Sequence, residues 1–426
     1  MIASERMNIG FLVTRKGYLK VLGSVIQAAV DHRHRVTLLW DPLETKPGEL
    51  IDPAEDLAAW PRAIVRQWNR GTPLLPALQA AGVEALVGTR LFYVLKAYGY
   101  EAEMAALAPA GIRVFNVDYI YDTITLDPDA YRYVDTTFYL SELQREVHWR
   151  VKAKEFAELG GDAATWRRRS AVCGSTMTDQ LARVDRAEVR RRYGIAAGRP
   201  VVVFTSLKMV VPDPWRRAVW GAEPRLKRIA RALRAGHLEW IPTILRTHGY
   251  RTLVQSVRRF CQRTGAALVV KSREKNDDPL FLRDLADVSL GDERVYPYTS
   301  MELMGIASLC IHFQSGASLE AAFAGVPSLS IVVPQPHLVA YPTFDEVYSA
   351  RPGTMQNFPG IVWSLPAEAV AAKLDASRLE DFRIDPAARS RYVEKFLGFD
   401  DTRSSERVLD EIERVSAAAP AVARSR

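Results

Sequence analysis

CIHFQSGASLEAAFAGVPSLSIVVP, residues Cys310–Pro334, contains a strand, a helix and a second strand in one short segment. An apolar run ends at His312 and a polar Gln-Ser-Gly-Ala-Ser turn follows. A helix of small residues then leads to a Gly-Val-Pro break and another apolar run. The polar side chains gather where the first strand ends. Because α/β proteins bind ligands at such places, this segment predicts both the fold class and the position of a site.

Length and composition place the chain among two-domain globular proteins. At 426 residues it is too long for one ordinary core, and its 48% hydrophobic and 25% charged residues exclude a disordered or fibrous protein. No apolar run approaches the roughly 20 residues that span a bilayer, and no signal-peptide pattern is found. Cys173, Cys261 and Cys310 lack the paired spacing of a metal site or a disulfide framework. A cytoplasmic protein is therefore expected.

The net charge of +7 comes largely from arginine-rich segments at Trp166–Ser170, Arg186–Gly194 and Trp215–Gly236. They fit solvated helix faces, or a surface that attracts an anionic ligand, a membrane or a nucleic acid. No RNA- or DNA-binding module accompanies them, so we predict no nucleic-acid partner. An acidic small molecule or a lipid headgroup is the better functional hypothesis.

The strand and helix pattern repeats in two halves. Ile9–Val13 is a buried apolar run, a helical pattern follows, and Arg35–Trp40 is the next strand, which predicts a right-handed βαβ unit. Similar units recur, and the pattern restarts at the β-branched strand Val201–Thr205. We predict an α/β protein with two doubly wound parallel-sheet domains that face a cleft.

The expected domains are residues 1–185 and 186–400. A closing helix over 401–416 is indicated by an N-cap signal and by apolar residues at helical spacing, namely Val408, Leu409, Ile412 and Val415. The tail 417–426 is predicted to be disordered.

The turn after His312 suits a phosphate group. A helix that starts there presents unpaired backbone N–H groups and the positive end of its dipole. Gly316 lets the backbone approach an anion, and Ser315 and Ser318 supply hydroxyls that bind it or cap the helix. Glu320 is suited to accept both hydroxyls of a ribose. The alternative is structural: the Ser-Gly pair caps a core helix, and Glu320 is a solvated charge.

These residues resemble the GT-B fold of nucleotide-sugar glycosyltransferases, a group that includes the non-hydrolysing UDP-N-acetylglucosamine 2-epimerases and the CDP-glycerol glycerophosphotransferases. In those families a similar segment holds the diphosphate with a Ser-Gly turn and the ribose with a glutamate. His312 and Glu320 keep the eight-residue separation of the His…Glu pair of plant-type glycosyltransferases. At motif level the resemblance covers Ile311–Pro334. It implies two Rossmann-like domains, the N-terminal one for an acceptor and the C-terminal one for a nucleotide sugar.

The sequence also departs from these families. Its first loop, TRKGYLK, has one glycine where many of these enzymes are glycine-rich. No Glu-x7-Glu pair starts at Glu320, which argues against the common retaining subgroup. The paired His-Pro elements of the glycerophosphotransferases are absent where the strand Ala267–Lys271 continues as SREKNDDP.

Residues that follow two further strands of the second half extend the implied donor site. Lys271 and Arg273 follow one buried strand, and Ser206 and Lys208 follow another. Fixed cations there would stabilise the charge that develops on a diphosphate leaving group, although they are also ordinary members of a basic chain. The predicted nucleotide-binding residues are Ser206, Lys208, Lys271, Arg273, His312, Ser315, Gly316, Ser318 and Glu320.

An inverting transfer needs a general base that deprotonates the acceptor hydroxyl. Asp118, at the end of a predicted strand, is the candidate, with Asp41 and Asp122 as alternatives. A capping or turn role stays open for each of them. The resemblance of the first βαβ unit implies that Lys16 and Tyr18 bind the acceptor.

We predict no essential metal and no cofactor. LDPDAYR contains an Asp-x-Asp, the metal signature of a different glycosyltransferase fold, but Pro128 favours a turn.

The sequence thus predicts an inverting, metal-independent glycosyltransferase. Its donor is a nucleotide sugar of the UDP, GDP or CMP/CDP type, and its acceptor is a bacterial polysaccharide, a lipid-linked glycan or a glycoconjugate. The alternatives are an enzyme like the CDP-glycerol glycerophosphotransferases or the UDP-GlcNAc 2-epimerases, and a catalytically inactive GT-B-like binding or scaffold protein. Peripheral association with an anionic membrane, at the inner face of the cell membrane, is the open alternative to a purely cytoplasmic location.

Overall fold

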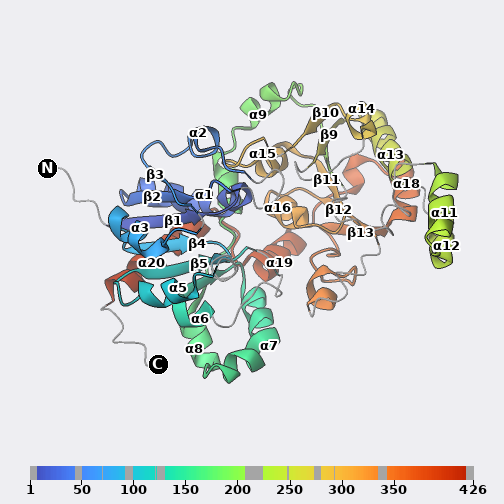
Figure 1. Cartoon of the computed structure of the whole chain (residues 1–426). Helices are drawn as coiled ribbons and strands as arrows, with labels where there is room; N and C mark the ends of the chain where they lie inside the picture. Colours follow the sequence, from blue (N-terminus) through green and yellow to red (C-terminus); the bar gives the residue numbers. More distant parts are fainter. Residues whose placement is uncertain are drawn as a thin grey trace.

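The computed structural model of the chain describes residues 7–43, 50–69, 71–91, 99–119, 121, 130–206, 224–246, 249–272, 280–291, 293–333 and 343–418. Figure 1 shows two sheets side by side, each flanked by helices. All pairs between the named strands are parallel. The predicted α/β class with two doubly wound sheets is confirmed.

The first sheet has seven strands in the order β3-β2-β1-β4-β5-β6-β7. From β1 the chain adds β2 and β3 on one side of the sheet and then β4 to β7 on the other side. The topological switch point therefore lies between β1 and β4. The strands are β1 (Asn8–Val13), β2 (Arg35–Trp40), β3 (Ile64–Gln67), β4 (Ala85–Gly88), β5 (Arg113–Val117), β6 (Thr136–Tyr139) and β7 (Ser170–Val172). Its helical segments are η1 (Lys16–Tyr18), α1 (Leu19–Asp31), α2 (Pro53–Asp56), α3 (Leu74–Ala81), α5 (Glu101–Leu107), α6 (Ala130–Tyr133), α7 (Glu142–Glu158), α8 (Ala163–Arg168) and η2 (Thr178–Arg183).

Local sequence explains where these elements lie. Every residue of β1 is buried because helices cover both faces of a parallel sheet. The Ser141 hydroxyl caps α7 by accepting the Gln144 N–H at 3.3 Å. Gly82, at a φ of 66°, ends α3 in the left-handed conformation that glycine adopts without strain.

The second sheet has six strands in the order β10-β9-β8-β11-β12-β13. Its strands are β8 (Val201–Thr205), β9 (Ala267–Lys271), β10 (Val288–Leu290), β11 (Leu309–His312), β12 (Ser328–Val332) and β13 (Val362–Pro366). The helical segments of this half are α9 (Arg186–Arg192), α11 (Arg225–Arg234), η3 (Leu238–Trp240), α12 (Ile241–Arg246), α13 (Gly249–Thr264), α14 (Phe281–Leu285), α15 (Thr299–Ile306), α16 (Ala317–Phe323), η4 (Phe344–Tyr348), α18 (Ala367–Ala376), η5 (Leu379–Asp381) and α19 (Pro386–Leu397). The quoted strand, helix and strand are β11, α16 and β12.

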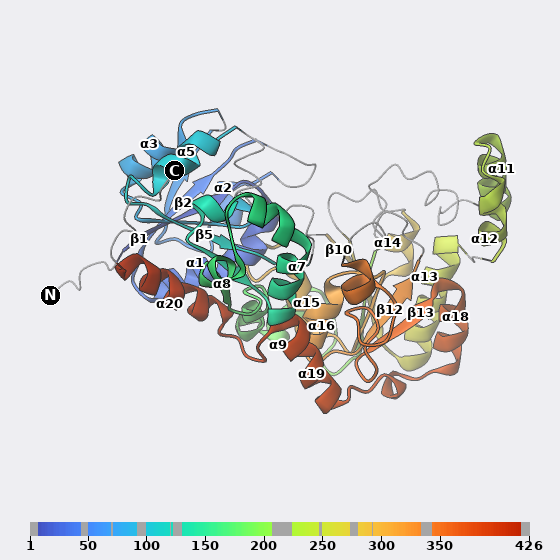
Figure 2. The same cartoon turned by 90° about the horizontal axis from the view of Figure 1, so that it is seen from below.

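The last helix, α20 (Ser404–Ala417), returns to the first sheet (Figures 1 and 2). Val408, Leu409 and Ile412 are fully buried in the core that contains α1 and β1. Asp179 fixes the start of α20 because its carboxylate accepts the backbone N–H groups of Ser404 and Ser405. The division at residues 185 and 186 stays a prediction; β7 ends at Val172 and β8 begins at Val201. Residues 419–426 of the predicted tail lie outside the described residues.

Side chains of the second half also pack into the first. The Tyr296 ring lies against Trp60 with 5.1 Å between ring centroids, and it occupies the space above Gly23. The Gln180 side chain accepts the Tyr298 N–H at 2.9 Å and donates to Lys20 O at 2.7 Å. These contacts join the two halves of the chain.

None of the described helices is long and apolar enough to cross a membrane.

Candidate functional site

The switch point of the second sheet lies between β8 and β11, which are hydrogen-bonded neighbours. Ile311 pairs with Phe204, so β11 ends beside the end of β8. On the other side of β8, the Ser206 N–H donates to Lys271 O at 2.9 Å. Ser206, Lys271 and His312 therefore lie at one edge of the sheet, on three neighbouring strands. The structure brings these three predicted residues together.

His312 is fully buried at the end of β11. Burial lowers its pKa to about 3, so its imidazole is neutral at physiological pH. Its Nδ1 accepts the Ser315 N–H at 3.4 Å, and we infer that the ring proton is on Nε2. Within the described ranges Nε2 has no hydrogen-bond partner. His312 therefore stabilises the turn through Nδ1 and leaves Nε2–H as a buried donor.

Two glutamines hold the turn after β11. Gln314, at a φ of 38°, accepts the Val333 N–H and donates to Tyr348 O, each at 3.3 Å. Gln356 is fully buried and donates to Ser315 O at 3.1 Å. Sequence reasoning missed Gln356 because it lies in a loop far along the chain with no motif around it.

Ser315 and Ser318 stabilise the start of α16. Ser315 Oγ accepts the Ala317 N–H at 3.3 Å, and Ser318 Oγ donates to Ser315 O at 3.0 Å. Ser318 is fully buried, whereas Gly316 is exposed. Among the described atoms, none lies within 4 Å of the place where a Gly316 Cβ would stand. Because φ of Gly316 is an ordinary −61°, the glycine is not needed for the turn and instead leaves the backbone open to solvent.

Glu320 lies in the first turns of α16 and is half-buried. The Ser300 hydroxyl of α15 donates to Glu320 Oε2, which holds the carboxylate between the two helices. Ser300 is itself buried. This contact could not be predicted from the sequence, because a serine at the start of a helix normally indicates a cap.

Lys271 ends β9 and is 7% exposed. Its Nζ donates to Ser272 O at 2.5 Å, so the cation is held at the edge of the sheet near Ser206. The other two predicted cations, Lys208 and Arg273, lie outside the described residues.

Asp118 follows β5 at the corresponding edge of the first sheet. Its Oδ1 accepts the Tyr119 N–H at 2.8 Å, and its Oδ2 lies 3.7 Å from Nδ1 of His148. His148, on α7, is fully buried with its ring edge-on to Tyr139, and burial lowers its pKa to about 3. Neither His148 nitrogen has a hydrogen-bond partner in the part of the chain that the structure describes. Sequence reasoning missed His148 because no motif surrounds it.

The predicted acceptor residues follow β1. Lys16 Nζ lies 3.2 Å from Asp56 Oδ1, an ion pair between η1 and α2. Tyr18 is buried, with the Arg15 guanidinium 5.6 Å from its ring centroid. Because β4 lies between β1 and β5, these residues share a sheet edge with Asp118 but do not stand on a neighbouring strand.

No cluster of three or more His, Cys, Asp or Glu side chains suited to a metal ion occurs among the described residues. Asp122 and the Asp-x-Asp at residues 127–129 lie outside them.

The chain has the GT-B fold. This fold consists of two doubly wound parallel sheets, each with a switch point between two central strands, and a final helix that returns to the first sheet. Solved structures with this fold match 96% of the chain. The wall teichoic acid polymerase TagF matches at 11% identity over 89% of its length, with a TM-score of 0.56. The UDP-GlcNAc 2-epimerase of Methanocaldococcus jannaschii matches at 11% identity over all of its length, with a TM-score of 0.56. MnaA of S. aureus, solved with UDP, matches at 12% identity over 96% of its length, with a TM-score of 0.52.

At these identities the likeness shows the fold alone. No protein-family model matches the sequence, and no curated protein matches it.

Proposed function

We propose that the chain binds a nucleotide sugar at the β8/β11 switch point and transfers the sugar to a glycan or lipid-linked acceptor, with inversion and without a metal ion. One observation carries the proposal: a buried neutral His312, the open backbone of Gly316 and the cation of Lys271 lie at one sheet edge. The GT-B fold, which the chain shares with a protein solved with UDP, supports a donor of this class.

In the proposed donor complex the diphosphate lies over Gly316 and Ser315. His312 Nε2–H and the Lys271 ammonium face it, and Ser206 adds a further polar group. Glu320, fixed by Ser300, accepts the ribose hydroxyls. The diphosphate leaves with increased negative charge, and fixed donors and cations stabilise that charge without reorganising. Lys208 and Arg273 are proposed as further cations, and Ser318 supports the turn from inside.

In the proposed reaction Asp118 removes the proton from the acceptor hydroxyl. The oxygen then forms a bond to the anomeric carbon while the bond from that carbon to the diphosphate breaks on the opposite face. His148 lies beside the Asp118 carboxylate and, because its imidazole is neutral, adds no positive charge that would lower the basicity of Asp118. Lys16 and Tyr18 are proposed to lie beside the acceptor. Closure of the two halves over the substrates would exclude water, which otherwise hydrolyses the donor.

A thermal-shift experiment with UDP, GDP, CDP, CMP and ADP tests the proposal, because a ligand that binds the folded chain raises its melting temperature. The unchanged chain is compared with Glu320→Ala and with Glu368→Ala, a control in the first turn of α18. We expect one nucleotide class to raise the melting temperature of the unchanged chain and the control but not of Glu320→Ala. Equal shifts in all three proteins would place the nucleotide elsewhere, and no shift with any nucleotide would refute the donor class.

The structures of TagF and of the 2-epimerases favour two alternatives on the same fold. An epimerase-like enzyme would release an epimer or free sugar in the absence of an acceptor. A glycerophosphotransferase-like enzyme would require a cytidine nucleotide and form phosphodiester bonds. Nucleotide affinity without any turnover would indicate a binding or scaffold protein. The proposed location in each case is the cytoplasm, with peripheral association at the inner face of the cell membrane as the alternative.

A further inference from the structure

Residues 224–246 form a short helical hairpin of α11, η3 and α12, which we call the basic hairpin. It is inserted between β8 and α13 and stands at the end of the molecule farthest from the first sheet (Figures 1 and 2). Four of the eight exposed large hydrophobic side chains found in the described residues lie on it. They are Leu226 at 80%, Leu233 at 49%, Leu238 at 63% and Leu245 at 50% exposure.

The exposed residues of α11 form two adjacent stripes. Leu226 and Leu233 are seven residues apart, so they lie on one helix face. Lys227, Arg231 and Arg234 follow the same spacing and form the neighbouring face. The leucines therefore lie beside a row of cations on the outer side of the hairpin.

The inner side of the basic hairpin is packed on the core of the second half. Ala232 and Ile244 are fully buried there, and Ile229 and Ile241 pack against the same core. The Trp240 ring stacks on His237 at 3.7 Å between centroids. Because this inner face is anchored, the outward direction of the leucines is set by the fold.

The charge of the hairpin is strongly positive. Residues 224–246 contain six Arg or Lys residues and a single acidic residue, Glu239, which contacts His237 at 2.9 Å. Leucines beside cations match the boundary of an anionic bilayer, where phosphate headgroups meet acyl chains. A nucleic acid would use the cations but would leave the leucines in water.

We propose that the basic hairpin binds the surface of an anionic lipid membrane, with its leucines in the acyl boundary and its cations at the headgroup phosphates. The proposal goes beyond the transfer reaction, because it rests on the outer face of the hairpin and on no residue of the nucleotide site.

Flotation of the full chain with vesicles tests this proposal. The vesicles contain phosphatidylcholine alone or phosphatidylcholine with phosphatidylglycerol. The apolar variant is Leu226→Asp with Leu233→Asp, and its control is Leu43→Asp with Val65→Asp, which changes exposed apolar residues of the first half.

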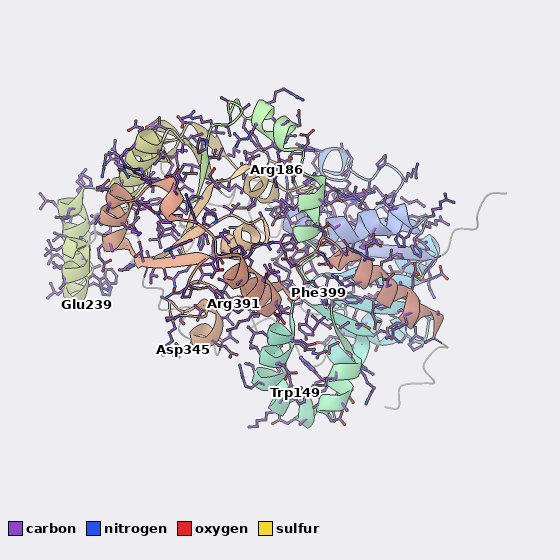
Figure 3. The ribbon with its side chains drawn as sticks, turned by 180° about the vertical axis from the view of Figure 1, so that it is seen from behind. Trp149, Arg186, Glu239, Asp345, Arg391 and Phe399 are labelled. Atoms are coloured by element: carbon purple, nitrogen blue, oxygen red, sulfur yellow. The ribbon has the colours of Figure 1, made fainter. Side chains whose placement is uncertain are left out.

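The charge variant is Lys227→Glu with Arg231→Glu and Arg234→Glu. Its control is Arg186→Glu with Arg383→Glu and Arg391→Glu; Figure 3 shows Arg186 and Arg391 far from Glu239 of the hairpin.

We expect the chain to float with phosphatidylglycerol vesicles and not with phosphatidylcholine alone. The partition coefficient onto phosphatidylglycerol vesicles should fall about tenfold or more in both hairpin variants and stay unchanged in both controls. Circular dichroism should show all variants folded, because the changed side chains are exposed. Failure to float, or flotation that the hairpin variants retain, would overturn the proposal. Self-association that Leu226→Asp with Leu233→Asp abolishes, without any flotation, would overturn it in favour of a contact between copies of the chain.

Discussion

Nδ1 of His148 lies 3.7 Å from Oδ2 of Asp118, and this contact joins the buried face of α7 to the carboxyl end of β5. The low pKa of His148 keeps its ring neutral, so it provides a dipole and not a charge beside the carboxylate. A neutral ring adds no positive charge beside the carboxylate, which suits the general base that we propose at Asp118. Asp41, the alternative base that lies in the described residues, accepts the Leu43 N–H at 3.0 Å.

Asp118→Asn should lower kcat by about 10²–10⁴-fold, the usual contribution of a general base. The nucleotide-induced shift in melting temperature should stay unchanged, because Asp118 lies on the other sheet. Asp41→Asn is the matched control: Asp41 is a buried carboxylate after β2 that accepts the Leu43 N–H at 3.0 Å. Loss of activity in the Asp41 variant alone would transfer the role of base to that residue.

Ser300→Ala should weaken nucleotide binding about tenfold, because it removes the hydrogen bond that fixes the Glu320 carboxylate. Titration calorimetry with the nucleotide found by thermal shift gives the dissociation constant. Ser256→Ala removes a buried hydroxyl that donates to Leu253 O at 2.7 Å, and it should leave that constant unchanged. Equal nucleotide affinities in the unchanged chain, Ser300→Ala and Ser256→Ala would show that Glu320 binds the nucleotide without the hydrogen bond from Ser300.

Gly316→Ala should separate binding from stability. Its φ of −61° suits alanine and the added methyl meets open space, so the free energy of unfolding should stay the same or rise by about 0.4–1 kcal/mol. The methyl group would stand where the diphosphate is proposed to lie, and nucleotide affinity should fall at least tenfold. Urea unfolding and calorimetry check the two parts. Unchanged affinity would exclude close approach of the diphosphate to this backbone.

Gly23→Ala should have the opposite effect on stability. Its Cβ would lie 2.7 Å from the Tyr296 ring and 3.2 Å from Trp60, so the two halves would be forced apart. We expect a loss of about 1–3 kcal/mol in the free energy of unfolding. In a Tyr296→Ala background the same change should cost less, which a double-mutant cycle measures. If the losses of stability from Gly23→Ala and Tyr296→Ala are additive, the Tyr296 ring moves aside without cost and the proposed clash is wrong.

Acid should destabilise the chain through its buried histidines. The native pKa of about 3 for His148 lies below the value of about 6.5 for an unfolded histidine, so the native state binds fewer protons between these pH values. The contribution of the neutral His148 ring to the free energy of unfolding is complete above the unfolded pKa. It is lost as the pH falls below that value, by up to about 1.4 kcal/mol per pH unit.

Urea unfolding between pH 7.5 and 5.5 measures this slope. His148→Gln should flatten it, because the variant lacks the imidazole that stays neutral in the folded chain. An identical slope in His148→Gln would show that His148 is protonated in the folded chain.

Local pattern was sufficient to predict the sheets and the turn at the switch point. β-branched runs such as Val201–Thr205 favour buried strands, and the order strand, turn, helix, strand in Cys310–Val333 favours a right-handed connection. The site at the end of β11 follows from that connectivity, because parallel strands end at one edge. The sequence alone therefore predicts that His312 and Ser206 lie at the same edge of the sheet.

Contacts between distant segments were decided by the tertiary structure alone. The apolar spacing of Val408, Leu409 and Ile412 predicts that α20 buries one face, but not that the face packs on the first sheet. Likewise nothing near Ser300 or His148 indicates that each contacts a carboxylate on another element. The physical reason is that hydrophobic burial is non-directional: sequence periodicity specifies which face a helix hides, and only the packing of the whole chain selects its partner.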